Sequence, residues 1–391
     1  MKTIELSSMM PVNALELDKF NKQTLIQVQH QQFTWETGWK NILQIALYQK
    51  GPDVSEVGST WLDNLGDMDA LRPFTPAELR ILGDQTAFLP GAWHKPASDD
   101  TQTVSIPWSV DTRLIIYRRD LLAKAGIVEA KAFETPDALF DTLLRLQNTG
   151  MQYPLSMATG GLTFHNLASF VWGRGGHFRS PELKKITLVE PAARQGMFDF
   201  YRLHVFINPH KGQLNYQGSD QTYLQGQTAV LISGQWVVQT IKTQADLPQA
   251  VTENSSYAQL PGIPYLGGTH LVAWRHSLHD PEIIRLITHL TNATVYQTIT
   301  RLANTFPARL EALNLPPFSN DSDYQLVAEI ARRGRGFQTA RRWGAIESRL
   351  NGFYEQLWAD LLANPELELE AEIEKRTREL AFHLERTVLA S

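Results

Sequence analysis

Apolar and polar residues alternate along the first 60 positions in the way that is typical of an α/β domain. Alternating runs predict strands at residues 3–6, 25–29 and 53–57. A strand–helix–strand–helix–strand order favours parallel pairing, and ligands of such sheets bind beyond the carboxyl ends of the strands. The helix before the third strand has apolar residues at helical spacing, namely Trp39, Ile42, Leu43, Ala46 and Leu47. The expected strand ends carry residues 7–11, 30–35 and 59–61.

Residues 104–126 are the most informative stretch of the chain. Residues 104–106 alternate, Pro107 cannot donate to a strand ladder, and residues 114–117 form a continuous apolar run. This pattern predicts two strands separated by a polar break. Trp108 and Asp111 fall in that break, where an indole and a carboxylate are well placed beside a cleft. The alternative for Asp111 is an ordinary surface turn.

The remaining sequence continues as alternating strands and helices and ends in helices. Strands are predicted at residues 154–158 and 229–232, and Gly234 allows a sharp turn before a helix that begins at Trp236. The last helix has an apolar stripe between residues 369 and 384. We find no internal repeat and no low-complexity linker that marks a domain boundary.

Composition narrows the class of protein. The 391 residues, 43% hydrophobic and 20% charged, are enough for two globular domains. A net charge of −5 gives no general attraction to nucleic acid or anionic lipid. The absence of cysteine excludes disulfides and thiolate chemistry. No apolar run reaches the about 18 residues that a membrane helix needs, and no secretory signal precedes the first predicted strand.

Sequence signatures of catalysis and cofactor binding are missing. There is no phosphate-binding Gly-Lys-Ser/Thr, and the glycines at residues 173–176 lack the spacing of a dinucleotide site. No Gly-x-Ser-x-Gly elbow occurs. His276 and His279 have no third ligand nearby, so we interpret them as loop residues and not as a metal site. We expect no cofactor, no metal and no catalytic residue, which favours a binding protein.

The stretch around Asp111 resembles a characteristic segment of the extracellular solute-binding proteins, family 1. This family comprises sugar-binding components of ABC importers and includes the maltose-binding proteins. In it the strand crosses from one lobe to the other, and the acidic residue lines the ligand cleft. The residues that match are Ile106, Pro107, Asp111, Tyr117, Asp120, Leu121, Ala125, Gly126 and Ile127.

Other segments extend the resemblance over nearly the whole chain. Matches in the same order occur at residues 222–238, 257–274, 304–309 and around Trp343, and a looser one at residues 51–73. The resemblance implies a two-lobe, type II periplasmic-binding-protein-like fold, with each lobe a sheet flanked by helices and a hinge between. We expect lobe 1 to comprise residues 1–110 and 265–310, and lobe 2 residues 111–264 and 311–391.

The resemblance also implies a ligand site in the cleft between the lobes. Asp111 is expected to accept hydrogen bonds from sugar hydroxyls, and Trp236 and Trp343 to stack on sugar rings; the alternative for Trp236 is a core residue between helices. Arg342, or its neighbour Arg341, is expected to reach a ligand hydroxyl. The further candidates are the backbone donors Gly267, Gly268 and Thr269, and the side chains of Trp35, Ser59, Trp61, His165 and Trp172.

The implied function is capture of a mono- or oligosaccharide and its delivery to ABC permease subunits. The chain is expected to be a monomer and extracytoplasmic, either periplasmic or tethered at the outer face of the membrane. Three alternatives stay open. They are a carbohydrate-active enzyme that uses Asp111 with a second acid, a cytosolic sensor domain with the same fold, and a binder of another polar solute such as a polyol or a glycerophosphodiester.

Overall fold

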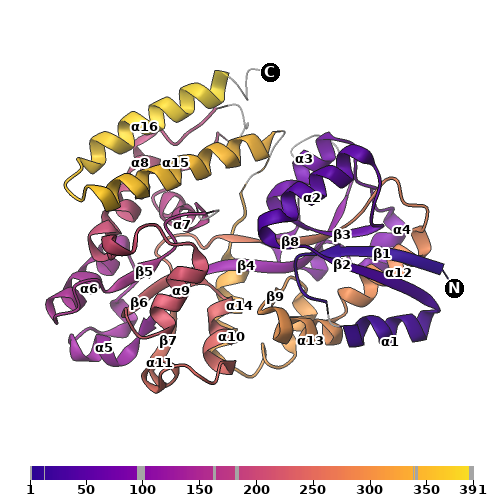
Figure 1. Ribbon diagram of the computed structural model, residues 1–391, viewed down its shortest axis with the longest axis horizontal. Helices are drawn as coiled ribbons and strands as arrows, with labels where there is room; N and C mark the ends of the chain where they lie inside the picture. Colours follow the sequence, from indigo (N-terminus) through magenta and orange to yellow (C-terminus); the bar gives the residue numbers. More distant parts are fainter. Residues whose placement is uncertain are drawn as a thin grey trace. The chain divides into compact units, whose positions relative to one another are not determined.

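The computed structural model describes residues 2–12, 14–94, 102–161, 164–180, 185–337, 339 and 342–386. The chain divides into two compact units, which are described separately here (Figure 1). The first consists of Met1–Asp111 and Leu266–Gly344, and the second of Thr112–Tyr265 and Ala345–Ser391. The backbone therefore passes from one unit to the other three times.

The first unit is built on a sheet with the strand order β2-β1-β3-β8-β4. Strands β1, β2 and β3 are parallel, as the sequence predicts, and β8 is antiparallel to β3. The short β9 pairs with β4 at Ser109 and Val110. The strands are β1 (Lys2–Ser8), β2 (Ile26–Gln32), β3 (Val54–Gly58), β4 (Ser105–Arg118), β8 (Leu266–Ala273) and β9 (Phe306–Pro307).

Helices cover this sheet because each presents an apolar side to it. Helix α2 buries Ile42, Ile45 and Ala46 in a core that also holds Val57. Leu47, which the helical spacing included, is exposed because the helix buries its other side. The helices of the unit are α1 (Ala14–Thr24), α2 (Trp35–Tyr48), α3 (Leu62–Asp67), α4 (Pro76–Leu82), α12 (Asp280–Leu290), α13 (Ala293–Ala303) and α14 (Ser322–Arg333).

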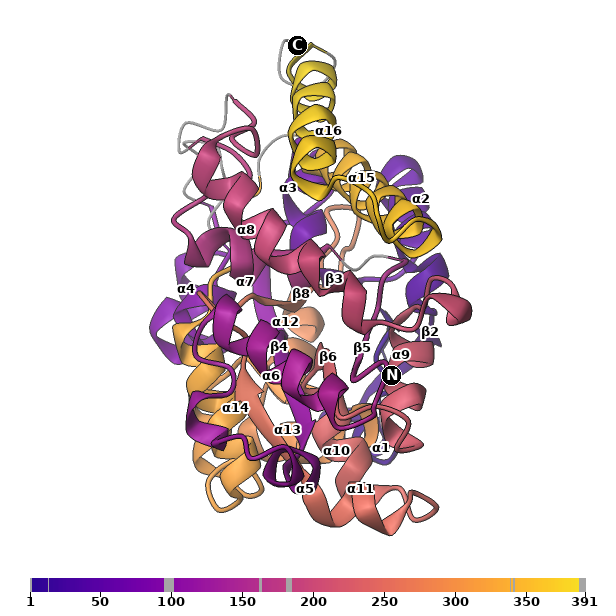
Figure 2. The same cartoon turned by 90° about the vertical axis from the view of Figure 1, so that its left-hand side faces the viewer.

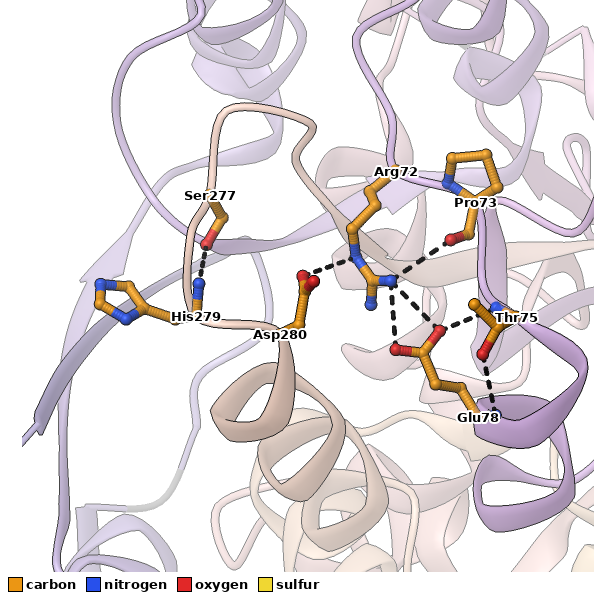
Figure 3. Close-up of polar contacts among 7 residues, drawn as sticks. All are labelled: Arg72, Pro73, Thr75, Glu78, Ser277, His279 and Asp280. Atoms are coloured by element: carbon orange, nitrogen blue, oxygen red, sulfur yellow. Dashed lines mark hydrogen bonds and ion pairs between the residues drawn. The ribbon is translucent and has the colours of Figure 1, made fainter.

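One arginine ties two of these helix starts together (Figure 3). Arg72 Nη1 lies 3.1 Å from both carboxylate oxygens of Glu78, which is part of the capping box with Thr75 at the start of α4. Its Nε lies 3.2 Å from Asp280, the first residue of α12. Because the guanidinium presents several N–H donors in one plane, a single side chain fixes both helix N-termini.

The second unit has a smaller sheet in which β4 lies between β7 and β6, with β5 beyond β6. Helix α16 packs along α8 on one side of this unit (Figure 2). The further strands are β5 (Leu155–Met157), β6 (Val230–Gly234) and β7 (Ser255–Gln259). The helices are α5 (Arg119–Lys124), α6 (Pro136–Asn148), α7 (His165–Gly173), α8 (Pro191–Tyr201), α9 (Tyr216–Leu224), α10 (Trp236–Thr243), α11 (Gln249–Asn254), α15 (Trp343–Ala363, its first two residues in the first unit) and α16 (Leu369–Leu384).

The predicted break between two strands at residues 107–111 does not exist. Strand β4 is continuous over 14 residues. The strand changes partners along its length: β9 pairs with Ser109 and Val110, β6 with the residues from Arg113 and β7 with those from Leu114. Trp108 is fully buried, and its Nε1 donates to the Leu290 carbonyl, so this indole is a core residue.

The third crossing lies further along the chain than the expected boundary after residue 310. Residues 311–344 belong to the first unit. Phe318 packs edge-on against Phe306 of β9, and the Leu266 N–H donates to the Arg335 carbonyl at the start of β8. These contacts hold the segment on the first sheet.

Strands β8 and β4 approach each other closely at Gly268. A Cβ at this position would lie 2.0 Å from the Ser109 carbonyl oxygen and 2.7 Å from Val110 Cα. The φ angle of Gly268 is +139°, which side chains rarely adopt. Only glycine combines the absence of a Cβ with easy access to this φ angle.

Substitution Gly268→Ala is therefore expected to lower the free energy of unfolding by more than about 3 kcal/mol, because backbone and not a flexible side chain meets the added methyl. Gly352→Ala is the matched control. Gly352 lies within α15, and nothing stands within 4 Å of its added Cβ. That variant is expected to keep or slightly raise stability, by up to about 1 kcal/mol. Urea unfolding measures both, and equal midpoints would contradict the prediction.

Candidate functional site

Two of the predicted indoles meet at the carboxyl edge of the first sheet. Trp35 begins α2 directly after β2, and Trp61 ends the 3₁₀ turn Ser59–Trp61 that follows β3. Their rings are 6.0 Å apart in an edge-on arrangement, and Trp39 lies 5.3 Å from Trp61. Trp35 is 49% exposed. The parallel strands thus bring Trp35, Ser59 and Trp61 to one edge, where their polar and aromatic groups can contact a solute.

The predicted residues of β8 lie at the same edge, because Thr269 pairs with Gly58 at the end of β3. Thr269 is buried, and its hydroxyl is 2.7 Å from that of Ser109. Gly267 is buried, and Gly268 is partly buried against β4. Their arrangement is thus explained by strand packing, and their role as backbone donors stays a prediction.

Asp111 is distinguished by its exposure. The other 13 residues of β4 are buried, and Asp111 is partly exposed. Asp111 thus brings a partly exposed carboxylate to the surface of an otherwise enclosed strand. Its role as acceptor for a sugar hydroxyl stays a prediction.

Residues 342–344 lie against α3, the helix that follows Trp61. The Arg342 N–H donates to the Asp67 carboxylate at 3.3 Å, and the Gly344 N–H donates to the Asn64 side-chain oxygen at 3.3 Å. Trp343 is only 1% exposed, and its ring packs 5.5 Å from that of Phe337. The indole therefore has no open face in this structure, and its stacking role remains a prediction. Arg341 lies outside the described residues.

A carboxylate that the sequence reasoning missed lies beneath this edge. Glu56 of β3 is completely buried, and its Oε2 accepts the N–H groups of Met9 and Met10 at 2.7 Å each. Burial raises the pKa of Glu56 to about 7, although these bonds and the Thr269 hydroxyl lower it. A group of this kind fixes the turn after β1 in one conformation.

In the second unit, aromatic rings gather around Arg113, where the pairing of β4 with β6 begins. The guanidinium lies 4.9 Å from the ring centre of Tyr216, 5.3 Å from that of Trp236 and 5.4 Å from that of Tyr265. Its Nε donates to the Tyr216 hydroxyl at 2.9 Å. Because Arg113 pairs with Gly234 at the end of β6, this cluster lies at one edge of the second sheet.

Trp236 is held in a defined orientation within this cluster. Its Nε1 donates to the Asp220 carboxylate at 2.7 Å, and the indole lies over Gly234, where a Cβ would come within 2.0 Å of the ring. Burial raises the pKa of Asp220 to about 6, although the bond from Trp236 and the charge of Arg113 lower it. The indole is partly exposed. A fixed, partly exposed indole is suited to stacking on a flat apolar ligand face.

His165, the first residue of α7, contacts the cluster. Its ring stacks on Tyr265 at 4.7 Å, with 26° between the planes, and its Nε2 is 3.9 Å from the Glu347 carboxylate. The next residue, Asn166, accepts a hydrogen bond from the Tyr216 hydroxyl. Trp172, at the far end of the helix, is 3% exposed and packs edge-on against Phe178. Trp172 thus has the surroundings of a core residue.

The sequence reasoning also missed Arg113, Tyr216, Asp220 and Tyr265. Arg113 and Glu56 did carry a signal, since each is a charged residue inside a strand that is otherwise mostly apolar. Such a residue is buried only with partners. Tyr216 and Tyr265 carried no such signal in the sequence, because they lie outside the strands and only folding brings their rings to Arg113.

Comparison with known families identifies the chain. Residues 17–325 match the family model described as bacterial extracellular solute-binding protein. The chain belongs to this family. The bacterial extracellular solute-binding proteins are a non-catalytic family that serves ABC transporters, so the chain has a solute as ligand and a permease as partner. The alternative of a carbohydrate-active enzyme is thereby set aside.

Solved structures of other solute-binding proteins share the fold over the whole chain. The sugar-binding protein MalE from Xanthomonas citri has 21% identity and a TM-score of 0.78, with 98% of this chain and 100% of that chain covered. A solute-binding protein from Thermotoga lettingae, bound with α-D-tagatose, has 19% identity and a TM-score of 0.81, with 99% of both chains covered. Maltose-bound T. maritima MalE3 has 16% identity and the same TM-score, with 98% and 100% covered. The solute-binding protein thus has the α/β periplasmic-binding-protein fold.

Other comparisons are negative. The search of curated proteins found no significant match to this chain. In the part of the chain that the structure describes, none of the helices combines the length and the apolar character that a bilayer-crossing segment requires. Within those same residues, histidine and acidic side chains nowhere gather in threes as a metal site requires.

The burial of Glu56 predicts a pH dependence of stability. The folded protein holds the Glu56 proton more tightly than the unfolded chain does, because its pKa is about 7 and the ordinary value is 4.5. The free energy of unfolding should therefore fall by up to about 3 kcal/mol as the pH rises from 4.5 to above 7. Glu56→Gln removes this pH-dependent contribution to the free energy of unfolding, because glutamine does not titrate. Urea unfolding at several pH values should show the wild type losing stability relative to the variant, and parallel curves would contradict the prediction.

Proposed function

We propose that this protein is the carbohydrate-binding component of an ABC importer, and that it captures a mono- or oligosaccharide for delivery to the permease. The observation that carries the proposal is the ring cluster at the edge of the second sheet. There Trp236 is partly exposed, is fixed by Asp220, and lies beside Arg113 and Tyr216. His165 stacks on Tyr265 of the same cluster.

The chemistry of this cluster suits a sugar. A pyranose ring has an apolar C–H face, which an indole covers, and a rim of hydroxyls, which charged and polar groups bind. Hydrogen bonds to charged groups contribute roughly 1.5–3 kcal/mol each, more than neutral ones. Trp236 supplies the aromatic surface that can cover the apolar face of the sugar, and Arg113 and His165 supply polar groups beside this indole.

The first unit offers a second set of groups of the same kind. Trp35 and Trp61 form an aromatic pair with Ser59 beside it, and Asp111 adds a carboxylate that reaches solvent. Proteins of the same fold support the choice of ligand. They include a solute-binding protein bound with α-D-tagatose, a maltose-bound MalE3 and a chitin oligosaccharide binding protein. The proposal includes the extracytoplasmic location, the two lobes and the ligand cleft between them that the family resemblance implies.

The proposal predicts that sugars stabilise the protein. A ligand at a hundred times its dissociation constant adds about 2.7 kcal/mol to the free energy of unfolding, which is visible as a higher melting temperature. A thermal-shift screen should cover mono-, di- and oligosaccharides, with polyols and glycerophosphodiesters as comparison solutes. We expect a clear shift with one class of sugar and no product formed. A shift with the comparison solutes alone would reject carbohydrate as the ligand.

Trp236→Ala is expected to weaken binding of that sugar at least tenfold, because the variant lacks the stacking surface. Tyr48→Ala is the control, since Tyr48 is an aromatic residue with 73% exposure at the opposite end of α2 from Trp35. Calorimetric titration of the folded variants should show near wild-type affinity for the control. Unchanged affinity of Trp236→Ala would remove this residue from the site.

A further inference from the structure

The turn after β1 is held by several polar contacts. Glu56 Oε2 accepts both the Met9 and Met10 N–H groups at 2.7 Å. The Ser8 hydroxyl donates to the Met10 carbonyl at 2.5 Å and lies 2.8 Å from His30 Nε2. Glu56 is the centre of this set, because one buried oxygen fixes two consecutive backbone groups.

The side chain of Met9 connects this turn to the aromatic pair of the first unit. A Cβ placed on Gly38 of α2 would lie 3.1 Å from Met9 Sδ and 3.5 Å from the Trp61 ring. Met9 and Trp61 therefore both pack on α2 beside Gly38, at a position where glycine leaves room for both. Trp61 in turn contacts Trp35 edge-on.

We infer that Glu56 is a positioning residue for solute binding. By fixing the backbone of Met9, it holds the thioether on α2 beside Gly38, next to the place where the Trp61 ring packs, and so sets the orientation of the Trp35–Trp61 pair that faces the solute. This inference rests on the proposed function, which places that pair in the ligand site. Glu56 itself is completely buried and acts through Met9.

The geometry specifies which replacements preserve this role. The bonds need an oxygen acceptor at the Oε2 position, and a glutamine side-chain oxygen can accept both N–H groups as the carboxylate does. An alanine leaves two buried N–H groups without an acceptor, so the turn moves to satisfy them. Glutamine should therefore preserve the site, and alanine should not.

The test compares Glu56→Ala, Glu56→Gln and Asp53→Asn in calorimetric titrations with the sugar that the thermal-shift screen identifies. Asp53 is the matched control because it is also a buried carboxylate, and it directly precedes β3, at the opposite end of the strand from the Trp35–Trp61 pair. It accepts hydrogen bonds from the Glu5 N–H and the Ser277 hydroxyl. All titrations are made well below the melting temperature of each variant, so that lost stability does not appear as lost affinity.

We expect Glu56→Ala to bind at least tenfold more weakly, and Glu56→Gln and Asp53→Asn to stay within threefold of the wild type. Wild-type affinity of Glu56→Ala, or an equal loss in Asp53→Asn, would overturn the inference. Should Glu56→Ala not fold, Met9→Ala removes the thioether that packs beside Gly38 and leaves the carboxylate in place. It is expected to give the same loss, and unchanged affinity would equally overturn the inference.

A second measurement needs no ligand and separates this inference from the proposed function. In protein labelled with 5-fluorotryptophan, the ¹⁹F resonance of Trp61 is assigned by its disappearance in Trp61→Phe. We expect it to shift in Glu56→Ala and to stay in place in Glu56→Gln and Asp53→Asn. If no sugar binds the wild type, the proposed function fails and this resonance still tests the link from Glu56 to Trp61. An unmoved resonance in Glu56→Ala would reject that link.

Discussion

Backbone pairing along β4 is the constraint on which the rest of the structure depends. In the first unit this strand pairs with β9 and lies beside β8, and in the second it lies between β6 and β7. One continuous strand thus provides hydrogen-bond partners for both sheets. It also decides where the candidate residues lie, since Asp111, Arg113 and the residues that pair with them are placed by its register.

Burial of charge at the edges of the sheets is the second common feature. Glu56 and Arg113 occupy strands, and Asp220 lies on α9 beneath Trp236. Each is buried and has defined partners, as desolvation demands. Glu56 fixes the turn after β1, and Asp220 fixes the Trp236 indole. Buried charge in these places therefore orders the backbone and the indole beside it.

Sequence reasoning failed where tertiary contacts override a local signal. Pro107 suggested the end of a strand, yet β4 continues past it and pairs with different strands along its length. Trp108 was placed in a break and is buried in the core. Residues 311–344 follow the lobe boundary that the family resemblance implied, but contacts of Phe318 and Arg335 hold them on the first unit. Each error arose from contacts between segments that are distant in the chain.

The sequence by itself determined the α/β class, the three parallel strands and the family. Alternation, helical spacing and glycine positions are local properties, and ordered motifs are visible without a structure. It also placed Trp35, Ser59 and Trp61 at one edge, because parallel strands end together. Only the tertiary structure decided what surrounds each indole: Trp236 lies among polar partners and is partly exposed, whereas Trp343 and Trp172 are buried. The physical reason is that burial depends on residues far away in the chain, which no local pattern encodes.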